Sequence, residues 1–205
     1  MAEDRDSELE DLLSKAKREP VLLAEETVVC PACGKPTLKV REYLYEVPYF
    51  GKIVLGEGRC SNCGYRYSDV RVAEVSEPKK IIVRVNGEKE LRYLLIKSAT
   101  AALLIKEKGY EMVPGPASTG FITTVEGILH RFLDVLEALC AGRDDPTCRD
   151  NKAWLERAIE GLESFTLIIC DFEGTSKVVG DNVEEKPIDE ECERLYEKSL
   201  EYLRR

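Results

Sequence analysis

Several residue types are scarce or absent in this chain of 205 residues. It has no glutamine, four asparagines, one tryptophan and a single histidine, His130. A Ser–His–Asp or Cys–His catalytic site could therefore be built only around His130, and neither a nucleophile-elbow motif nor a P-loop motif is present. We therefore expect a protein that is not an enzyme. Few amides together with 34% charged residues is the composition expected of a thermophile protein.

Long apolar runs and an excess of positive charge are missing as well. No run approaches the roughly 18 apolar residues of a membrane-spanning helix. No signal peptide precedes the first motifs, so we expect a cytoplasmic protein with no membrane partner.

The net charge of −9 argues against broad nucleic-acid binding. Residues 35–84 are mildly basic and residues 171–193 strongly acidic, which we interpret as two solvated faces or as a device that steers a charged protein partner.

Two Cys-x-x-Cys pairs, Cys30/Cys33 and Cys60/Cys63, are the most informative feature present, and a glycine follows each pair. Four thiolates match the tetrahedral shell that Zn²⁺ prefers, and glycine suits the positive φ that such a turn needs. We therefore expect one structural Zn²⁺ held by these four cysteines. The alternatives are two disulfides, a redox dithiol or an iron–sulfur cluster; the missing signal peptide and the missing βαβ pattern disfavour the first two.

The other four cysteines are expected to be free thiols, because sequence alone supplies no disulfide geometry. They are Cys140, Cys148, Cys170 and Cys192. A disulfide remains the alternative for Cys140 and Cys148, since these two flank one short loop.

Strand-like runs dominate the chain from the first cysteine pair onward, and Asn86-Gly87 predicts a hairpin turn. The run at 165–170 is apolar on both faces and predicts a central strand. The remaining strands are expected at 39–45, 52–55, 65–67, 70–72, 80–85, 93–97, 101–105 and 177–179.

Helical periodicity occurs at four places. A short helix is expected at 7–18, a helical hairpin at 124–141 and about 150–163, and a closing helix at 188–204. Thr123 and Glu126 have the spacing of a capping box at the start of the hairpin. The predicted domains are a lead-in at 1–27, a zinc ribbon at 28–74, a β domain at 75–185 with the hairpin inserted at 123–163, and a C-terminal helix at 186–205.

Taken in order, several short motifs resemble the ZPR-type zinc-finger family over about Val29 to Val179. The specific part is Thr123-Thr124-Val125-Glu126-Gly127 at its distance from the cysteines. The other motifs are the cysteine pairs, Pro48-Tyr49-Phe50, Gly64-Tyr65-Arg66, Lys97-Ser98-Ala99 and Asp171 to Ser176. Eukaryotic members carry two modules, each a zinc ribbon plus a double-stranded β-helix domain with an inserted helical hairpin. This chain looks like the single-module, archaeal-type version.

The resemblance implies binding to translation elongation factor one-alpha, for which eukaryotic members act as a folding chaperone. Two departures stand out: the second module is missing, and Asp-Phe-Glu-Gly-Thr-Ser replaces the usual Asp-Pro-x-Gly-Asn-Ser. The residues that we expect at a partner surface are Tyr49, Phe50, Tyr65, Arg66, Thr123, Thr124 and Glu126.

Each of these residues also has a purely structural interpretation. Because neighbouring strand residues point to opposite faces, one of Tyr49 and Phe50 can pack while the other is exposed. Tyr65 is more typical of a core position, and Thr123 and Glu126 need no role beyond helix capping.

The leading hypothesis is a non-enzymatic, zinc-stabilised protein-interaction module. The alternative is a nucleic-acid-binding ribbon of transcription or translation, in which aromatic side chains stack on bases. Its candidate aromatics are Tyr43, Tyr45, Tyr49, Phe50, Tyr65 and Tyr67.

Overall fold

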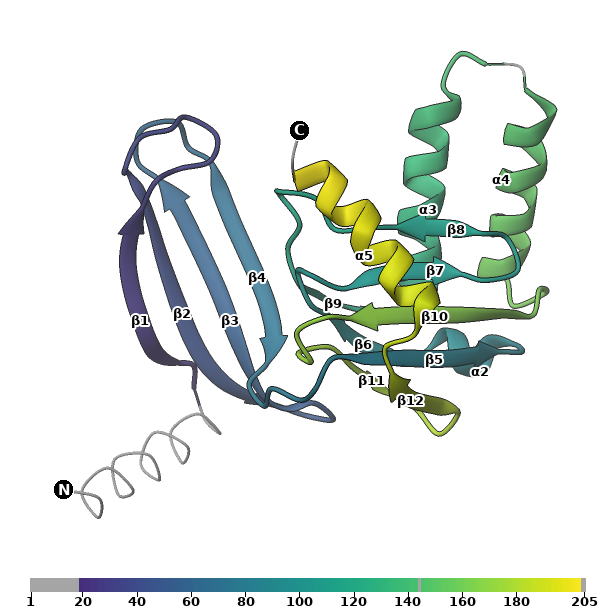
Figure 1. Cartoon of the computed structure of the whole chain (residues 1–205), viewed down its shortest axis with the longest axis horizontal. Helices are drawn as coiled ribbons and strands as arrows, with labels where there is room; N and C mark the ends of the chain where they lie inside the picture. Colours follow the sequence, from purple (N-terminus) through teal and green to yellow (C-terminus); the bar gives the residue numbers. More distant parts are fainter. Residues whose placement is uncertain (1–18, 144, 204–205) are drawn as a thin grey trace.

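A curved four-stranded sheet forms one end of the molecule and a two-layered β structure forms the other (Figure 1). The computed structural model describes residues 19–143 and 145–203, so the predicted helix at 7–18 lies outside the described residues. The first sheet is an antiparallel meander in the order β1-β2-β3-β4, which we call the ribbon sheet. Its strands are β1 (Val21–Val28), β2 (Leu38–Val47), β3 (Gly51–Cys60) and β4 (Arg66–Val72).

The second part, called the sandwich here, contains two further sheets. One has five strands in the order β12-β5-β10-β7-β8, and the other has three strands in the order β11-β6-β9. The predicted central position of the strand at 165–170 is confirmed, because β10 lies between β5 and β7. The bounds are β5 (Lys79–Val85), β6 (Leu94–Lys97), β7 (Ala102–Ile105), β8 (Tyr110–Met112), β9 (Phe121–Thr124), β10 (Phe165–Asp171), β11 (Lys177–Val179) and β12 (Val183–Pro187).

The main hydrophobic core lies between these two sheets and the helical hairpin. Leu95 of β6 and Leu103 of β7 belong to it, together with Leu129 and Trp154 of the hairpin, and all four are buried. The mainly β fold class with inserted helices is therefore confirmed, and neither sheet closes into a barrel. The helices are α2 (Glu88–Leu91), α3 (Val125–Cys140), α4 (Pro146–Ile159) and α5 (Glu190–Leu203).

The helical hairpin is present, but its caps differ from the prediction. The N-cap of α3 is Thr124, whose side chain accepts a hydrogen bond from the Gly127 amide at 3.1 Å. The expected capping box of Thr123 and Glu126 is wrong by one residue, because Thr124, and not Thr123, makes the cap hydrogen bond with the amide of Gly127. The second helix begins at Pro146 rather than near 150, since Asp145 caps it and proline fits the first turn of a helix.

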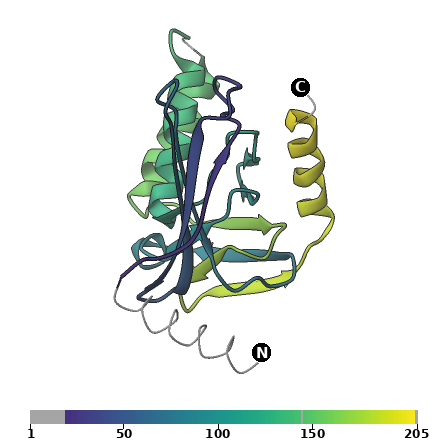
Figure 2. The same cartoon turned by 90° about the vertical axis from the view of Figure 1, so that its left-hand side faces the viewer.

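Helix α5 covers the face of the five-stranded sheet that is turned away from the hairpin (Figure 2). Cys192 and Leu195 of this helix are buried against Ile168 and Cys170 of β10. The expectation of four free thiols is wrong, because Cys170 forms a disulfide with Cys192, and Cys140 forms one with Cys148. Sequence spacing could not reveal the first pair, since packing of α5 brings its two Cα atoms to 5.4 Å.

The predicted hairpin at Asn86-Gly87 is also wrong. The short helix α2 follows the dipeptide, and β5 pairs with β10 and β12 rather than with the next strand. The sequence also failed to predict four strands as such: β1, β8, β9 and β12. All four lie at sheet edges, where a strand does not need apolar residues on both faces.

The ribbon sheet is fixed to the sandwich through β4. Phe50, Val70 and Val72 of the ribbon sheet pack with Ile96 of β6 in one buried cluster. On the other side of β4, the buried carboxylate of Asp69 accepts a hydrogen bond from the Gly120 amide at 2.5 Å. An apolar and a polar contact therefore hold the two parts together on both faces of this strand.

Lys97, at the end of β6, is an unusual buried cation. Its side chain is 4% exposed, and its ammonium has no hydrogen-bond partner within the described ranges. Burial lowers the pKa of Lys97 to about 8, although the charges of Asp69 and Asp171 act in the opposite direction. As the pH rises, Lys97 therefore loses its proton near pH 8 in the folded chain but only near pH 10.5 in the unfolded chain.

We predict a pH-dependent stability that Lys97→Met removes. Between pH about 8 and about 10.5 the unfolded state binds one more proton at Lys97 than the folded state does, so stability rises with pH. Relative to Lys97→Met, the free energy of unfolding of the native sequence should rise by about 3 kcal/mol across this window. Urea unfolding at several pH values measures it, with the exposed Lys106→Met as control. Parallel profiles for the native chain and Lys97→Met would contradict the assignment.

Candidate metal centre and functional site

Two matching turns hold the four cysteines at one end of the ribbon sheet. The first joins β1 to β2 and the second joins β3 to β4. In each turn the amide of a glycine donates to the carbonyl of the first cysteine, from Gly34 to Cys30 at 2.8 Å and from Gly64 to Cys60 at 3.1 Å. Both glycines have positive φ, 70° and 76°, which favours glycine at these positions.

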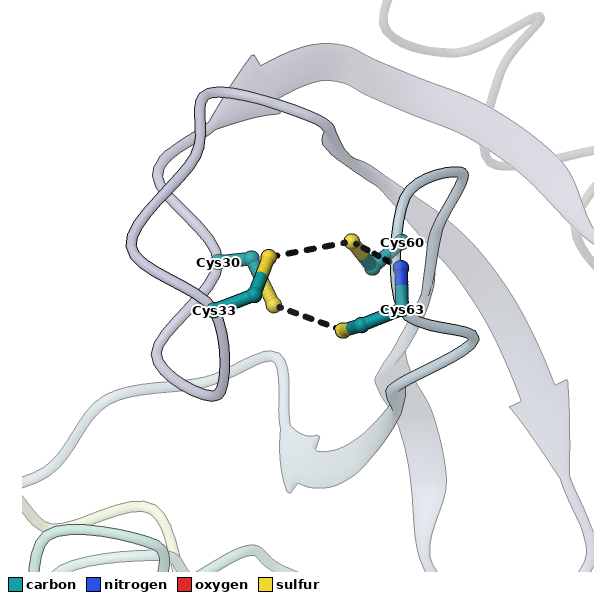
Figure 3. A group of neighbouring side chains, drawn as sticks. All are labelled: Cys30, Cys33, Cys60 and Cys63. Carbon is teal, nitrogen blue, oxygen red and sulfur yellow. Dashed lines mark hydrogen bonds between the residues drawn. The ribbon is translucent and has the colours of Figure 1, made fainter.

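The four sulfurs converge on one point (Figure 3). All lie within 4.8 Å of one another, with Cys30 Sγ 3.7 Å from Cys63 Sγ and Cys33 Sγ 3.8 Å from Cys60 Sγ. These distances are far longer than the roughly 2.05 Å of a disulfide. They match the edges, about 3.8 Å, of a tetrahedron whose metal–sulfur bonds are about 2.3 Å. The residues therefore fit one structural Zn²⁺, as predicted.

Hydrogen bonds prepare Cys60 for the thiolate form. The hydroxyl of Thr37 lies 3.2 Å from its sulfur, and the amide of Cys63 donates to the same sulfur at 3.4 Å. The Thr37 contact is the main reason why the pKa of Cys60 falls to about 6. The pKa of Cys63 rises to about 12 although the Tyr65 amide lowers it, because desolvation and the three neighbouring cysteines disfavour another negative charge. A bound cation removes that repulsion.

A second feature lies at the opposite end of the ribbon sheet, where the turn between β2 and β3 meets the turn between β10 and β11. A hollow of about 800 Å³ lies there, lined by Tyr49, Phe50, Gly174 and Ser176 among others. The Nζ of Lys177 donates to the carbonyl of Phe50 at 3.1 Å and closes the contact. Two segments that carried the family resemblance, Pro48 to Phe50 and Asp171 to Ser176, therefore line one surface.

Tyr49 and Phe50 differ in burial as expected, but both lie in the turn between β2 and β3, so the cause is the turn conformation and not alternation along a strand. Phe50 is buried, 6% exposed, in the cluster that joins the ribbon sheet to the sandwich. Tyr49 is 74% exposed and has a φ of 70°, the only positive value among the described non-glycine residues. A side chain in this backbone region costs about 1 kcal/mol or more, so the turn holds the Tyr49 ring in solvent at a cost.

A buried polar network connects two motifs of the family resemblance, Lys97-Ser98-Ala99 and Asp171 to Ser176. The carboxylate of Asp171 accepts hydrogen bonds from the Ser98 hydroxyl at 3.1 Å and from the Ser176 amide at 2.6 Å. The Ser98 amide donates in turn to the Ser176 hydroxyl at 3.0 Å. Sequence reasoning used these segments only for the resemblance and missed their role as a brace beneath the hollow. A serine in each motif, with an aspartate at the end of an apolar strand, was the available signal.

The other predicted partner residues lie elsewhere. Tyr65 is half-buried against the cysteine end of the ribbon sheet, and Arg66 is exposed at the start of β4. The ten residues of β3 separate this end from Tyr49 by about 30 Å. Thr123, Thr124 and Glu126 lie on the sandwich instead, at the start of α3. The structure therefore does not gather the seven candidates into one site.

The structure also places the residues considered for catalysis and for nucleic-acid binding. His130 is exposed on α3, and its Nε2 lies 3.8 Å from Glu126. Of the six aromatics proposed to stack on bases, Phe50 and Tyr45 pack in the cluster between the ribbon sheet and the sandwich. Within the described ranges, no helix has the length and apolar character needed to cross a bilayer.

We predict that Cys60→Ser abolishes zinc binding. Metal analysis should find one Zn²⁺ per native chain and none per variant chain, because three thiolates and a hydroxyl form a weaker and less charged ligand set. Circular dichroism should show loss of folded ribbon structure, since the site contributes folding energy. The matched control is Cys140→Ser/Cys148→Ser, which removes sulfurs outside the quartet and should keep its zinc. A zinc-loaded Cys60→Ser chain would contradict the assignment.

Comparison with known proteins gives the family. Residues 25–78 match the ZPR1 zinc-finger domain, and residues 89–202 match the ZPR1 jelly-roll domain, in agreement with the double-stranded β-helix expected from the resemblance. An uncharacterized ZPR1-like protein of Methanocaldococcus jannaschii is 36% identical over 82% of this chain and 88% of its own length.

Two further relatives are informative. A ZPR1-like protein of Pyrococcus horikoshii is 32% identical over 79% of this chain and 76% of its own length. The zinc finger chaperone zpr1 of Schizosaccharomyces pombe is 32% identical over 69% of this chain but only 33% of its own length. With both of its domains matched and archaeal relatives covering most of its length, the chain belongs to the ZPR1 family of zinc-finger proteins.

Proposed function

We propose that this chain is a protein-binding module that engages translation elongation factor one-alpha and assists its folding. The observation that carries the proposal is the hollow at the β2–β3 turn, where two segments of the family pattern meet beside the exposed ring of Tyr49. The name of the Schizosaccharomyces pombe relative, a zinc finger chaperone, supports the folding role. The family resemblance supports elongation factor one-alpha as the partner.

The side chains around the hollow are of the kinds that protein–protein interfaces use. Tyr49 and Val75 are both 74% exposed at its rim, and Lys52 and Glu74 line it as well. Protein interfaces are typically anchored by a few aromatic side chains inside a polar rim. The buried contacts of Phe50 and the bond from Lys177 hold the turn in place, so the Tyr49 ring is presented with little loss of conformational freedom on binding.

The proposed role is binding rather than catalysis. His130 pairs with Glu126 on the exposed face of α3, in the manner of an ordinary helix surface pair. Any nucleotide dependence would then belong to the partner GTPase. The zinc would act at a distance from the Tyr49 surface, by fixing the ribbon sheet that carries this turn.

We predict that Tyr49→Gly weakens partner binding without weakening the fold. Glycine removes the ring and also relieves the positive φ, so the free energy of unfolding should stay the same or rise by about 1 kcal/mol. Loss of an aromatic anchor typically costs about 2 kcal/mol, or about 30-fold in affinity. Binding of purified elongation factor one-alpha, measured by calorimetry, gives the affinity, and pull-down from a native lysate identifies the partner.

Tyr202→Gly on α5 is the matched control, because it removes another exposed tyrosine from the far side of the five-stranded sheet. Unchanged affinity in Tyr49→Gly would show that the hollow is not the contact surface. Failure of the native chain to capture or bind the elongation factor would overturn the proposed partner.

A further inference from the structure

The cysteine end of the ribbon sheet carries a row of three cations on one face. Lys39 of β2 lies directly opposite Arg59 of β3, and Arg59 lies directly opposite Arg66 of β4. Directly paired residues on antiparallel strands point to the same face, with Cβ atoms about 5 Å apart. Like charges in this arrangement repel and cost stability, so the row calls for an explanation.

The acids of the ribbon sheet neutralise only part of the positive charge on this face. Glu25 binds Lys39 at 2.7 Å and Arg41 at 2.6 Å, and Glu57 lies 3.7 Å from Arg41. Arg59 and Arg66 are both exposed, and neither has an acid within ion-pair distance anywhere in residues 19–143 and 145–203. The two side chains are therefore adjacent like charges without a neutralising acid, in a chain that has 39 acids and a net charge of −9.

The same two arginines line a hollow on the ribbon sheet with a volume of about 980 Å³. Lys39 and Arg41 lie on its β2 side, and Ser61, Gly64 and Ser68 line it beside the second cysteine turn. The turn is fixed by the Cys60–Gly64 hydrogen bond and by the metal quartet. The two arginines therefore flank a rigid turn, and both line the hollow beside it.

We propose that Arg59 and Arg66 form a binding site for an acidic segment of a protein partner, with each guanidinium taking a carboxylate. A planar guanidinium binds a carboxylate through two parallel hydrogen bonds, and a pair of unneutralised arginines gains more from it than a pair already bound to acids. The site rests on the proposed role as a protein-binding module, but not on the identity of the partner. It lies at the end of β3 opposite the Tyr49 surface, so a partner could touch both.

The charge pattern favours an acidic peptide over a nucleic acid. Nucleic-acid binding typically neutralises several phosphates along a continuous basic footprint. On this face of the ribbon sheet, Arg59 and Arg66 are the described arginines that lack an acid partner, and Glu25 and Glu57 lie on the same face. A long polyanion would extend past Arg59 and Arg66 toward these acids, whereas a short segment with two carboxylates needs to contact the two arginines alone.

The test is a titration of the full-length, zinc-loaded chain with a fluorescein-labelled oligoglutamate peptide at low salt. Arg59→Gln/Arg66→Gln should weaken peptide binding about 10-fold or more, as expected for loss of charge-assisted hydrogen bonds. The matched control is Arg84→Gln/Arg92→Gln, which removes the same charge from exposed arginines that are paired with Glu184 and Glu88. In the native chain, NMR shifts on titration should centre on the amides of Ser61, Gly64 and Ser68.

A stability measurement separates a binding role from a structural one. The variant that loses the repelling pair should melt at the same or a higher temperature than the native chain, since the pair costs stability without a ligand. Peptide affinity equal to that of the native chain, or a lower melting temperature, would overturn the site. Tighter binding of a single-stranded oligonucleotide of equal charge would replace the acidic peptide as the ligand and overturn the proposal.

The peptide titration tests the arginine site separately from the proposed elongation-factor partner. The peptide titration does not use that protein, so a failure here leaves the proposed function standing. Retained peptide binding without capture of the elongation factor would instead remove the proposed partner and leave the arginine site intact.

Discussion

Four cysteine sulfurs within 4.8 Å of one another constrain the rest of the ribbon sheet. As thiolates they would repel strongly, and desolvation together with the three neighbouring cysteines raises the pKa of Cys63. A divalent cation that prefers tetrahedral sulfur ligands offsets this repulsion and cross-links the two cysteine turns. It ties the β1–β2 connection to the β3–β4 connection, and the two turns fix the order of the strands between them.

This cross-link has consequences at both ends of the ribbon sheet. At the cysteine end it anchors the turn next to Arg59 and Arg66. At the other end, about ten residues along β3, the same strands carry the Tyr49 turn, which a second set of contacts fixes. Phe50 packs against Ile96 of the sandwich, and the Asp171–Ser98–Ser176 network supports the neighbouring loop. The zinc thus fixes the ribbon sheet at its cysteine end, and the contacts with the sandwich fix it at the Tyr49 end.

Much of the fold and the metal centre could be predicted from local sequence. The cysteine spacing and the glycines at positive φ are properties of single turns, so they identified the zinc site. The apolar run of β10 and the periodicity of α3 likewise report burial directly. Helix boundaries were less accurate, because two adjacent threonines offered two caps and only the hydrogen bond from the Gly127 amide identifies Thr124.

Features that depend on distant packing could not be predicted. Cys170 and Cys192 meet only because α5 covers the sandwich sheet, and no pattern in either segment states that contact. The hairpin expected at Asn86-Gly87 failed because the favourable partners of β5 are β10 and β12, far along the chain. The Arg59–Arg66 pair also needs strand register, which the sequence does not give. The candidate partner residues were single positions, and only the fold shows that they occupy three separate surfaces.

The central claim is that the metal quartet holds the ribbon sheet in shape while the sandwich keeps its own fold. Hydrogen exchange of the zinc-loaded chain before and after chelation, read strand by strand by mass spectrometry, tests it most directly. We expect chelation to remove most protection from β2 and β3 near the cysteine turns and to leave β5, β7 and β10 protected. Equal protection of β2 and β3 with and without zinc, or loss of protection throughout the sandwich, would contradict the account.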